Sequence, residues 1–311
     1  MSAQMQDRVA SETSLLTSFR KAVFASVPPI PEAINLKDQT GIITGSNAVR
    51  SQSKGDNAAE LLARQFPAAT IQVWLLDMES NASVRSFARR CESLERINFL
   101  ILNAGVGKMT FEKSNEGKGR EVTLQVNYIN TMLLAILMVP VLKAKAQDRP
   151  NRLTVVGSDM SYWAALPETS GSLLDALDNK EGYNGMQHYG KTKLLLLMGV
   201  AKLSQTVTAD EVTINYLNPG ATKGTGLNRE ASGVWKIVPF VMDRVIGREV
   251  VDSARQYLHS AVVLGKESHG SFTDFVIRPY PKLMYNEAGQ KRMNRLWDET
   301  LSELGLSTHS I

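Results

Sequence analysis

The chain has 311 residues, of which 43% are hydrophobic and 21% are charged, and its formal net charge is +4 at pH 7. These values are typical of a globular protein with one or two domains. Basic residues are spread along the chain without a cluster, so we expect no nucleic-acid partner. A single cysteine, Cys91, excludes an internal disulfide, and the four histidines have no metal-ligand spacing, so we expect no metal site.

Residues 1–35 predict a helical extension to the main domain. Residues 14–27 are weakly amphipathic and end at a proline pair, so we expect a helix packed on the domain. Contact with a membrane surface or a partner is the alternative. The longest apolar run, residues 131–142, is too short to span a bilayer and contains Pro140. Without a secretory signal, we expect a cytoplasmic protein with no integral membrane span.

Strand and helix signals alternate through residues 36–311. Strands are expected at residues 42–44, 70–77, 97–105, 152–158, 212–220 and 270–277, and helices at residues 56–66, 83–94, 120–145, 189–205 and 250–263. This order predicts an α/β fold, a Rossmann-like doubly wound parallel sheet in a single domain. Ligands bind outside the carboxyl ends of the strands in such a sheet, so residues that directly follow strands are candidates for a site.

Tyr189 and Lys193 are four residues apart near the start of an expected helix, so their side chains share one face. A free tyrosine has a pKa near ~10, and an adjacent ammonium group lowers that pKa by stabilising the phenolate. The pair could then exchange a proton with a carbonyl or alcohol oxygen. Ser158, at the end of a strand, could hold that oxygen, and Asn127 could anchor a water that links Lys193 to solvent.

Each of these residues also has an ordinary structural explanation. Tyrosine and lysine often fall four apart on a solvated helix, a serine is common at a strand end, and an asparagine suits a helix surface. The catalytic interpretation is favoured by a series of motifs, each at a consistent place in the α/β pattern. The series is Thr44-Gly45, Asp77, Asn103-Ala104-Gly105, Asn127, Ser158, Tyr189 with Lys193, and Pro219-Gly220.

The series resembles the short-chain dehydrogenase/reductase family over about residues 36–300. The resemblance is carried by "LNAG" (102–105), "VVGS" (155–158), "YGKTK" (189–193) and "NPGATKGTG" (218–226). It implies that Tyr189 donates or accepts the proton, and that Lys193 orients the ribose and lowers the tyrosine pKa. It also implies that Ser158 positions the carbonyl and that Asn127 completes a proton relay. Hydride would pass between a nicotinamide and a substrate carbon.

The resemblance also implies a set of residues that contact the cofactor. They are Thr44, Gly45, Ser46, Asn47, Arg50, Asp77, Asn103, Ala104, Gly105, Tyr189, Lys193, Pro219, Gly220 and Thr222. Arg50 stands where a guanidinium would meet the 2′-phosphate of NADP, although a solvated loop arginine is its ordinary interpretation. We therefore expect NADP(H), with NAD(H) as the less favoured alternative.

The turn after Gly45 departs from the family pattern, which continues with two more glycines, a helix and a second strand. Here "AVRSQSKG" follows Asn47 at once, so we expect a fold one strand and one helix short. The missing glycines and helix N-terminus would hold a pyrophosphate. A crossover by helix 56–66 to a strand at residues 70–77 could close the sheet, with Asp77 binding a ribose hydroxyl. A chain that folds poorly, or that lacks a piece of its functional parent, is the alternative.

Residues 159–188 and the C-terminal tail are similar to the retinol-dehydrogenase-like branch, particularly to fungal members, which often act in secondary metabolism. The resemblance implies an alcohol–carbonyl oxidoreductase (EC 1.1.1.- type) that interconverts a ketone or aldehyde and an alcohol. Its substrate would be a hydrophobic small molecule such as a polyketide-type intermediate. One alternative is a remnant that binds no cofactor and acts, if at all, through a partner. A second alternative is a lipid-surface protein that uses residues 14–27.

The loops after Ser158 and over residues 221–240 carry apolar side chains that would line a substrate pocket or serve as core packing. They are Tyr162, Trp163, Leu166, Trp235, Val238 and Phe240. Family members often assemble through the helices expected at residues 120–145 and 189–205, so a homodimer or homotetramer stays open.

Overall fold

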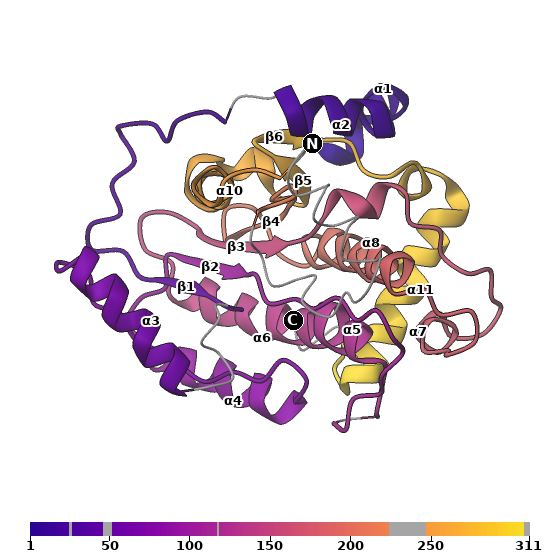
Figure 1. The fold of residues 1–311 in the computed structure, drawn as a ribbon, viewed down its shortest axis with the longest axis horizontal. Helices are drawn as coiled ribbons and strands as arrows, with labels where there is room; N and C mark the ends of the chain where they lie inside the picture. The colour runs from indigo at the N-terminus through magenta and orange to yellow at the C-terminus, as the bar shows by residue number, and fades with distance from the viewer. Residues whose placement is uncertain (25–26, 46–51, 117, 224–246, 308–311) are drawn as a thin grey trace.

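The computed structural model describes residues 1–24, 27–45, 52–116, 118–223 and 247–307. These residues build a six-stranded sheet with the order β1-β2-β3-β4-β5-β6 (Figure 1). The strands are β1 (Gly41–Ile43), β2 (Phe99–Leu102), β3 (Asn151–Val156), β4 (Val212–Leu217), β5 (Ser271–Asp274) and β6 (Val276–Arg278). Neighbouring strands from β1 to β5 are parallel, and β6 is antiparallel to β5. The expected mostly parallel α/β sheet is confirmed.

Helices cover both faces of the sheet (Figure 1). They are α1 (Val9–Glu12), α2 (Leu15–Phe24), α3 (Gln52–Gln65), α4 (Asn81–Glu92), α5 (Val122–Leu124), α6 (Thr131–Ala144), α7 (Leu173–Leu177), α8 (Gly185–Leu203), α10 (Val250–Leu258) and α11 (Glu287–Leu304). Wide π-helical turns join α5 to α6 (Gln125–Asn130) and extend α10 (His259–Val263). Single helical turns span Ser2–Gln4, Gln6–Arg8, Asp159–Tyr162, Lys266–Ser268 and Lys282–Tyr285.

Two apolar cores hold these layers together. The larger core lies between the sheet and helices α4, α6, α8 and α11. The smaller core joins Ala261 and Val262, just after α10, to sheet residues Ile101, Val156 and Leu217. Because both faces are covered, β4 is buried at every position, including its polar residues Thr213 and Asn215. This is a Rossmann-like single domain, as the sequence predicts.

Residues 70–77 do not form the strand that the sequence predicts. Their apolar side chains instead pack on helix α4. The Trp74 ring meets Phe87 edge to face at 5.9 Å between centroids, and the Arg90 guanidinium lies 4.0 Å from the Trp74 ring centroid. Leu76 is buried in the larger core. The segment is therefore fixed by side-chain packing, and the expected crossover that would close the sheet is wrong.

The sheet consequently ends at β1. Among the described residues, β1 pairs with β2 alone, and Ile43 is 57% exposed. The helix expected at residues 56–66 is present as α3, but its apolar side chains point into solvent: Leu61 is 67% exposed, and Phe66, just after the helix, is 53% exposed. An open sheet edge and a poorly covered helix thus flank the turn after Gly45.

The last expected strand, residues 270–277, is two strands. β5 and β6 form a tight hairpin in which Phe275 adopts a positive φ of 56°. The turn at Phe275 reverses the direction of the chain. The pattern of side chains along this segment does not reveal the reversal, so one continuous strand was expected.

The N-terminal segment docks on this hairpin. The Phe272 N–H donates to Ser2 Oγ at 3.0 Å, and Arg278 Nε lies 2.9 Å from a Glu12 carboxylate oxygen. Helix α2 follows, but Leu15 and Leu16 are exposed, so the first residues rather than the amphipathic helix provide the packing.

In the described chain, one helical stretch is long and apolar enough to cross a membrane. It is Val122–Ala144, which comprises α5, the π-helical turn and α6, and 94% of its most apolar window is buried inside the fold. A buried core helix of a soluble protein passes the same test, so this stretch is weak evidence for a membrane span.

Candidate active site

Ser158 directly follows β3 and is fixed by Tyr216, a buried residue of β4. The Ser158 N–H donates to Tyr216 Oη at 2.8 Å. The same Oη lies 3.1 Å from the Ser158 carbonyl oxygen and 3.2 Å from the Lys193 carbonyl oxygen. Gly157 permits this approach, because a Cβ there would lie 1.7 Å from the Tyr216 ring. One phenol therefore ties the candidate serine to helix α8.

Tyr189 and Lys193 lie on one face of α8. The helix begins at Gly185, where the Asn184 side chain caps it by accepting the N–H of Gln187 at 3.0 Å. Lys193 is buried; its Nζ lies 5.6 Å from the centroid of the Tyr189 ring and donates to the Val156 carbonyl at 3.0 Å. The structure thus brings the predicted tyrosine and lysine together beside the end of β3.

Burial dominates the protonation of both groups. It raises the pKa of Tyr189 above its ordinary value of 10; the Asp159 carboxylate adds to that rise, and a hydrogen bond from Ser158 opposes it. Burial lowers the pKa of Lys193 to about 8. Lys193 is not among the causes of the shift at Tyr189, so the expectation that Lys193 lowers the tyrosine pKa stays a prediction.

Asn127 lies in the π-helical turn between α5 and α6, a geometry that is common at functional sites. Its Oδ1 accepts the Val106 N–H at 2.8 Å, and its Nδ2 donates to the Val106 carbonyl at 2.8 Å. A weaker contact of 3.3 Å reaches Thr192 Oγ1 on α8. The side chain thus holds the loop after β2 against α8, which makes Asn127 a positioning residue.

The ends of β1 and β2 form one unit. Thr44 Oγ1 accepts the N–H groups of Asn103 at 3.1 Å and Ala104 at 3.2 Å, and Asn103 Nδ2 donates to the Thr44 carbonyl at 3.0 Å. Gly45 has a φ of 79°, and a Cβ there would lie 2.4 Å from Ala104 Cα. Four of the predicted cofactor residues therefore meet at the carboxyl edge of the sheet.

Gly105 connects this unit to the candidate catalytic residues. A Cβ at Gly105 would lie 3.3 Å from Asn127 Oδ1 and 3.5 Å from Lys193 Nζ. Only a residue without a side chain leaves the space between them open, which suits close approach of a ligand.

The loop after β4 lies on the other side of Ser158. Asn218 Oδ1 accepts the N–H groups of Asp159 at 3.1 Å and of Gly220 at 3.2 Å. Gly220, which follows Pro219, has a φ of 72°. Thr222 Oγ1 lies 2.7 Å from Ser253 Oγ of α10. The predicted Pro219, Gly220 and Thr222 thus lie in the loop after β4, next to the turn that begins at Ser158.

Other predicted residues are not brought to the site. The Asp77 carboxylate accepts the Glu79 N–H at 3.0 Å in the turn before α4, and no hydrogen bond within the described residues links it to Thr44 or Asn103. Its predicted ribose contact therefore has no support, because residues 70–77 are not in the sheet. Six further predicted residues lie outside the described residues: Ser46, Asn47, Arg50, Trp235, Val238 and Phe240.

The aromatic residues after Ser158 mainly pack within the fold. Tyr162 stacks on Phe272 at 4.8 Å between centroids and donates to the Pro279 carbonyl at 2.8 Å. Leu166 belongs to the larger core, whereas Trp163 is partly exposed and donates to the Thr13 carbonyl at 3.1 Å. These side chains support the loop more than they line an open pocket.

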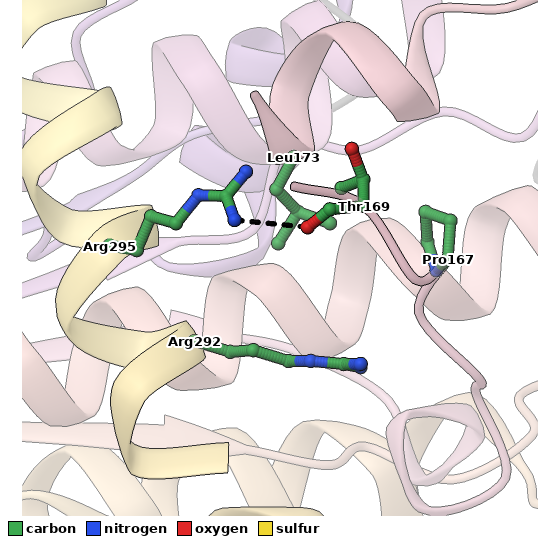
Figure 2. Close-up of a pocket in the computed structure, with 5 residues that line it drawn as sticks. All are labelled: Pro167, Thr169, Leu173, Arg292 and Arg295. Atoms are coloured by element: carbon green, nitrogen blue, oxygen red, sulfur yellow. Dashed lines mark hydrogen bonds between the residues drawn. The ribbon is translucent and has the colours of Figure 1, made fainter. Parts of the chain in front are cut away.

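A small pocket lies away from this site, between α7 and α11 (Figure 2). It is lined by Pro167, Thr169, Leu173, Arg292 and Arg295. Arg295 donates to the Thr169 carbonyl at 3.0 Å and pairs with Glu299 at 3.0 Å. The contacts of Arg295 therefore join α11 to the loop before α7. No group of side chains in the described residues could hold a metal ion.

Comparisons with known proteins agree with these motifs. The chain is 40% identical to the short chain dehydrogenase virL of Hypocrea virens, covering 98% of this chain and 96% of that protein. It is 38% identical to the short chain dehydrogenase/reductase mfmJ of Annulohypoxylon moriforme, covering 92% and 90%. The chain belongs to the short-chain dehydrogenase/reductase family. It is therefore an oxidoreductase by family, although no protein-family model matches it.

Solved structures of this family share the fold. An NADPH-bound short chain oxidoreductase of Pseudomonas aeruginosa PAO1 superposes with a TM-score of 0.54 at 17% identity, covering 76% of this chain and 93% of that one. The carbonyl reductase Sniffer of D. melanogaster gives 0.52 at 17% identity, covering 87% and 96%. Similarity at this level shows only that the folds are alike.

Proposed function

We propose that this short-chain dehydrogenase uses NADP(H) to interconvert a ketone or aldehyde and an alcohol on a hydrophobic small molecule. The observation that carries the proposal is the proximity of Ser158, Tyr189 and Lys193. Tyr216 hydrogen-bonds the backbone of Ser158 and of Lys193, and Lys193 Nζ lies 5.6 Å from the Tyr189 ring centroid. The substrate class we favour is an intermediate of fungal secondary metabolism, because the relatives reported above are fungal dehydrogenases. The retinol-dehydrogenase-like branch is part of the same proposal.

The roles of the residues follow from their positions. The Tyr189 hydroxyl exchanges a proton with the substrate oxygen, since its high pKa keeps it protonated at neutral pH. Ser158 Oγ holds the same oxygen by a hydrogen bond. The buried Lys193 ammonium stabilises a developing phenolate, and this interaction strengthens as Tyr189 gives up its proton.

The residues that remain fit a dinucleotide at its nicotinamide end. Gly45, Gly105 and Gly220 leave bare backbone at the carboxyl edge of the sheet, where a Cβ at Gly45 would meet Ala104. When bound there, the nicotinamide supplies or accepts the hydride. The choice of NADP rests on Arg50, whose guanidinium suits a 2′-phosphate.

We infer that the chain has lost a strand and a helix after Asn47. Its match to the Hypocrea virens protein extends over 329 aligned positions, more than the 311 residues of the chain, so gaps fall within this chain. Loss of a strand beside β1 explains both the open edge of β1 and the unpaired state of residues 70–77. The proposed domain boundaries are an extension over residues 1–35 and an enzyme domain over 36–311.

The same open edge favours one alternative. A chain without the phosphate-binding loop could fold yet bind no cofactor, and would then act through a partner if at all. Exposure of Leu61 and Phe66 beside the edge is the observation behind this alternative.

We also propose that the protein is cytoplasmic, because its one cysteine is a buried free thiol, which suits a reducing compartment. Helix α8 is covered by α11, and every residue from Thr192 to Ala201 is buried within one chain. A homodimer or homotetramer would therefore use other surfaces.

The decisive test of the chemistry is Tyr189→Phe. Wild-type protein should oxidise NADPH in the presence of an aryl ketone, and the variant should lose about 100-fold or more in kcat, because the proton donor is gone. Its NADPH dissociation constant should change by less than about twofold. The matched control is Tyr285→Phe, which should keep full activity. The Tyr285 hydroxyl donates to the carbonyl of Ser2 in the N-terminal segment. Retained turnover in Tyr189→Phe would contradict the mechanism.

A further inference from the structure

Two carboxylates lie near the candidate site among the described residues, Asp274 and Asp159, and they differ in how many protein partners they have. Asp274 of β5 accepts a hydrogen bond from the Gln256 side-chain amide and lies 3.9 Å from the Arg248 guanidinium. Arg248 also donates to Gln256 Oε1 at 2.7 Å. Asp274 is therefore held inside a network of an amide and a cation, which explains a carboxylate in the interior.

Asp159 has no such explanation. In the part of the chain that the structure describes, it forms no ion pair, and its one side-chain hydrogen bond is with Ser158 Oγ at 3.5 Å, the outer limit for such a bond. An ionised carboxylate can accept about four hydrogen bonds. Most of the accepting capacity of Asp159 is thus unused by the protein.

The position of Asp159 is tightly fixed. Its N–H donates to Asn218 Oδ1 at 3.1 Å, and the next residues close a helical turn in which Ser161 Oγ donates to the Ser158 carbonyl at 2.8 Å. This turn abuts α8: a Cβ at Gly190 would lie 3.4 Å from the Met160 carbonyl oxygen. The turn that carries Asp159 is therefore fixed against α8, the helix that carries Tyr189.

Protonation in the site is consistent with this placement. Burial and the charge of Asp274 raise the pKa of Asp159 to about 6, and Arg248 opposes the rise. In turn the Asp159 carboxylate raises the pKa of Tyr189. Near neutral pH, Asp159 is thus largely ionised and can act as an acceptor.

We propose that Asp159 is a specificity-determining residue whose carboxylate accepts a hydrogen bond from a hydroxyl group on the substrate. Because Asp159 Oδ1 lies 3.5 Å from Ser158 Oγ, which holds the reacting oxygen, that hydroxyl sits on a carbon one or two bonds from the carbonyl. The substrate class is then an α- or β-hydroxy ketone or aldehyde, or the corresponding diol. The inference rests on the proposed function, because Ser158 must hold the reacting oxygen.

The test compares binding of two alcohols that differ by one hydroxyl. Isothermal titration of 1-phenylethane-1,2-diol and of 1-phenylethanol into the full chain with NADP gives an affinity ratio. Wild type should prefer the diol by about tenfold or more, as expected for a hydrogen bond to a charged group. Asp159→Asn should reduce the preference, and Asp159→Leu should abolish it. Melting curves of both variants establish that they are folded.

The matched control is Asp210→Leu, at a carboxylate that is 76% exposed and pairs with Lys266, and it should keep the wild-type preference. Equal affinity of wild type for both alcohols, no binding of either, or a preference that survives in Asp159→Leu would each overturn the role of Asp159. Turnover of 2-hydroxy-1-phenylethanone compared with turnover of 1-phenylethanone tests the proposed oxidoreductase activity separately from the binding measurements. NADPH oxidation with both ketones, without discrimination, would sustain the proposed function and reject the specificity.

Discussion

Tyr216 shows how a residue outside any motif can hold a candidate catalytic serine. Its hydroxyl bonds both backbone groups of Ser158 and reaches the carbonyl of Lys193. The residue was not predicted, because its role depends on a contact with Gly157, just after the adjacent strand β3 and far from Tyr216 in the sequence. By contrast, the spacing of Tyr189 and Lys193 is local and was predictable from helical periodicity.

Tyr216→Phe should therefore impair both stability and catalysis. The variant leaves the buried Ser158 N–H without its acceptor, which costs about 1–3 kcal/mol of unfolding free energy. Freed from this bond, Ser158 should be poorly placed, and kcat should fall by about tenfold or more. Urea unfolding and steady-state kinetics measure the two effects.

Tyr280→Phe is the control for that substitution. Tyr280 is also buried, and its hydroxyl bonds the Gly270 carbonyl, away from the site. It should lose comparable stability while keeping kcat. Equal loss of kcat in both variants would show that the effect of Tyr216 is on folding alone.

Lys193 gives the site a pH signature. Its pKa is about 8 in the folded chain, below the ordinary value of 10.5 that it regains on unfolding. Above pH 8 the unfolded chain therefore binds more protons at this position than the folded chain, so the free energy of unfolding rises with pH. Between about pH 8 and about pH 9.5 the expected rise is on the order of 1.5 kcal/mol.

Replacement of the ammonium tests this directly. Lys193→Met keeps an unbranched side chain one heavy atom shorter than lysine and cannot titrate, so the unfolding free energy of this variant should lack that rise over the same range. Urea titrations of both proteins at the two pH values give the difference. Identical pH slopes would mean that Lys193 is solvated in the native state.

At the scale of elements, residues 70–77 and 97–105 illustrate what a local pattern can decide. Both are apolar runs of strand-like composition, yet only the second became a strand, β2. β2 has partners on both sides, whereas residues 70–77 pack their side chains on α4. Whether an apolar run forms a strand depends on whether the fold places another strand beside it. Residue composition does not contain that information.

The exposed helix α3 makes a testable claim about the open edge. Leu61→Lys should change the free energy of unfolding by less than about 0.5 kcal/mol, because the side chain is 67% exposed. Leu196→Ala, at a buried position of α8, should cost about 2–5 kcal/mol. Denaturant unfolding of the two variants compares them. A large loss for Leu61→Lys would show that α3 packs on the domain in solution.

At the scale of the whole molecule, the family relation favours an active dehydrogenase, whereas the open sheet edge favours the alternative of a chain that binds no cofactor. Relatives that are 38–40% identical over most of the chain are named short chain dehydrogenases, and the described residues keep the candidate Ser158, Tyr189 and Lys193 close together. The half that would hold the pyrophosphate includes residues outside the described chain, and beside it the sheet ends at β1. The family motifs and the missing strand and helix after Asn47 were both expected from the sequence. The open edge of β1 was not expected, because residues 70–77 could have formed the strand that closes the sheet.

The central claim is that this chain folds and binds NADP(H). The direct measurement is a thermal melt of the 311-residue protein alone, with NADPH and with NADH. We expect one cooperative transition, and we expect NADPH to raise its melting temperature more than NADH does. A ligand at 100 times its dissociation constant adds about 2.7 kcal/mol to folded-state stability. A cooperative transition that neither nucleotide moves would contradict the claim and identify a folded protein without its cofactor.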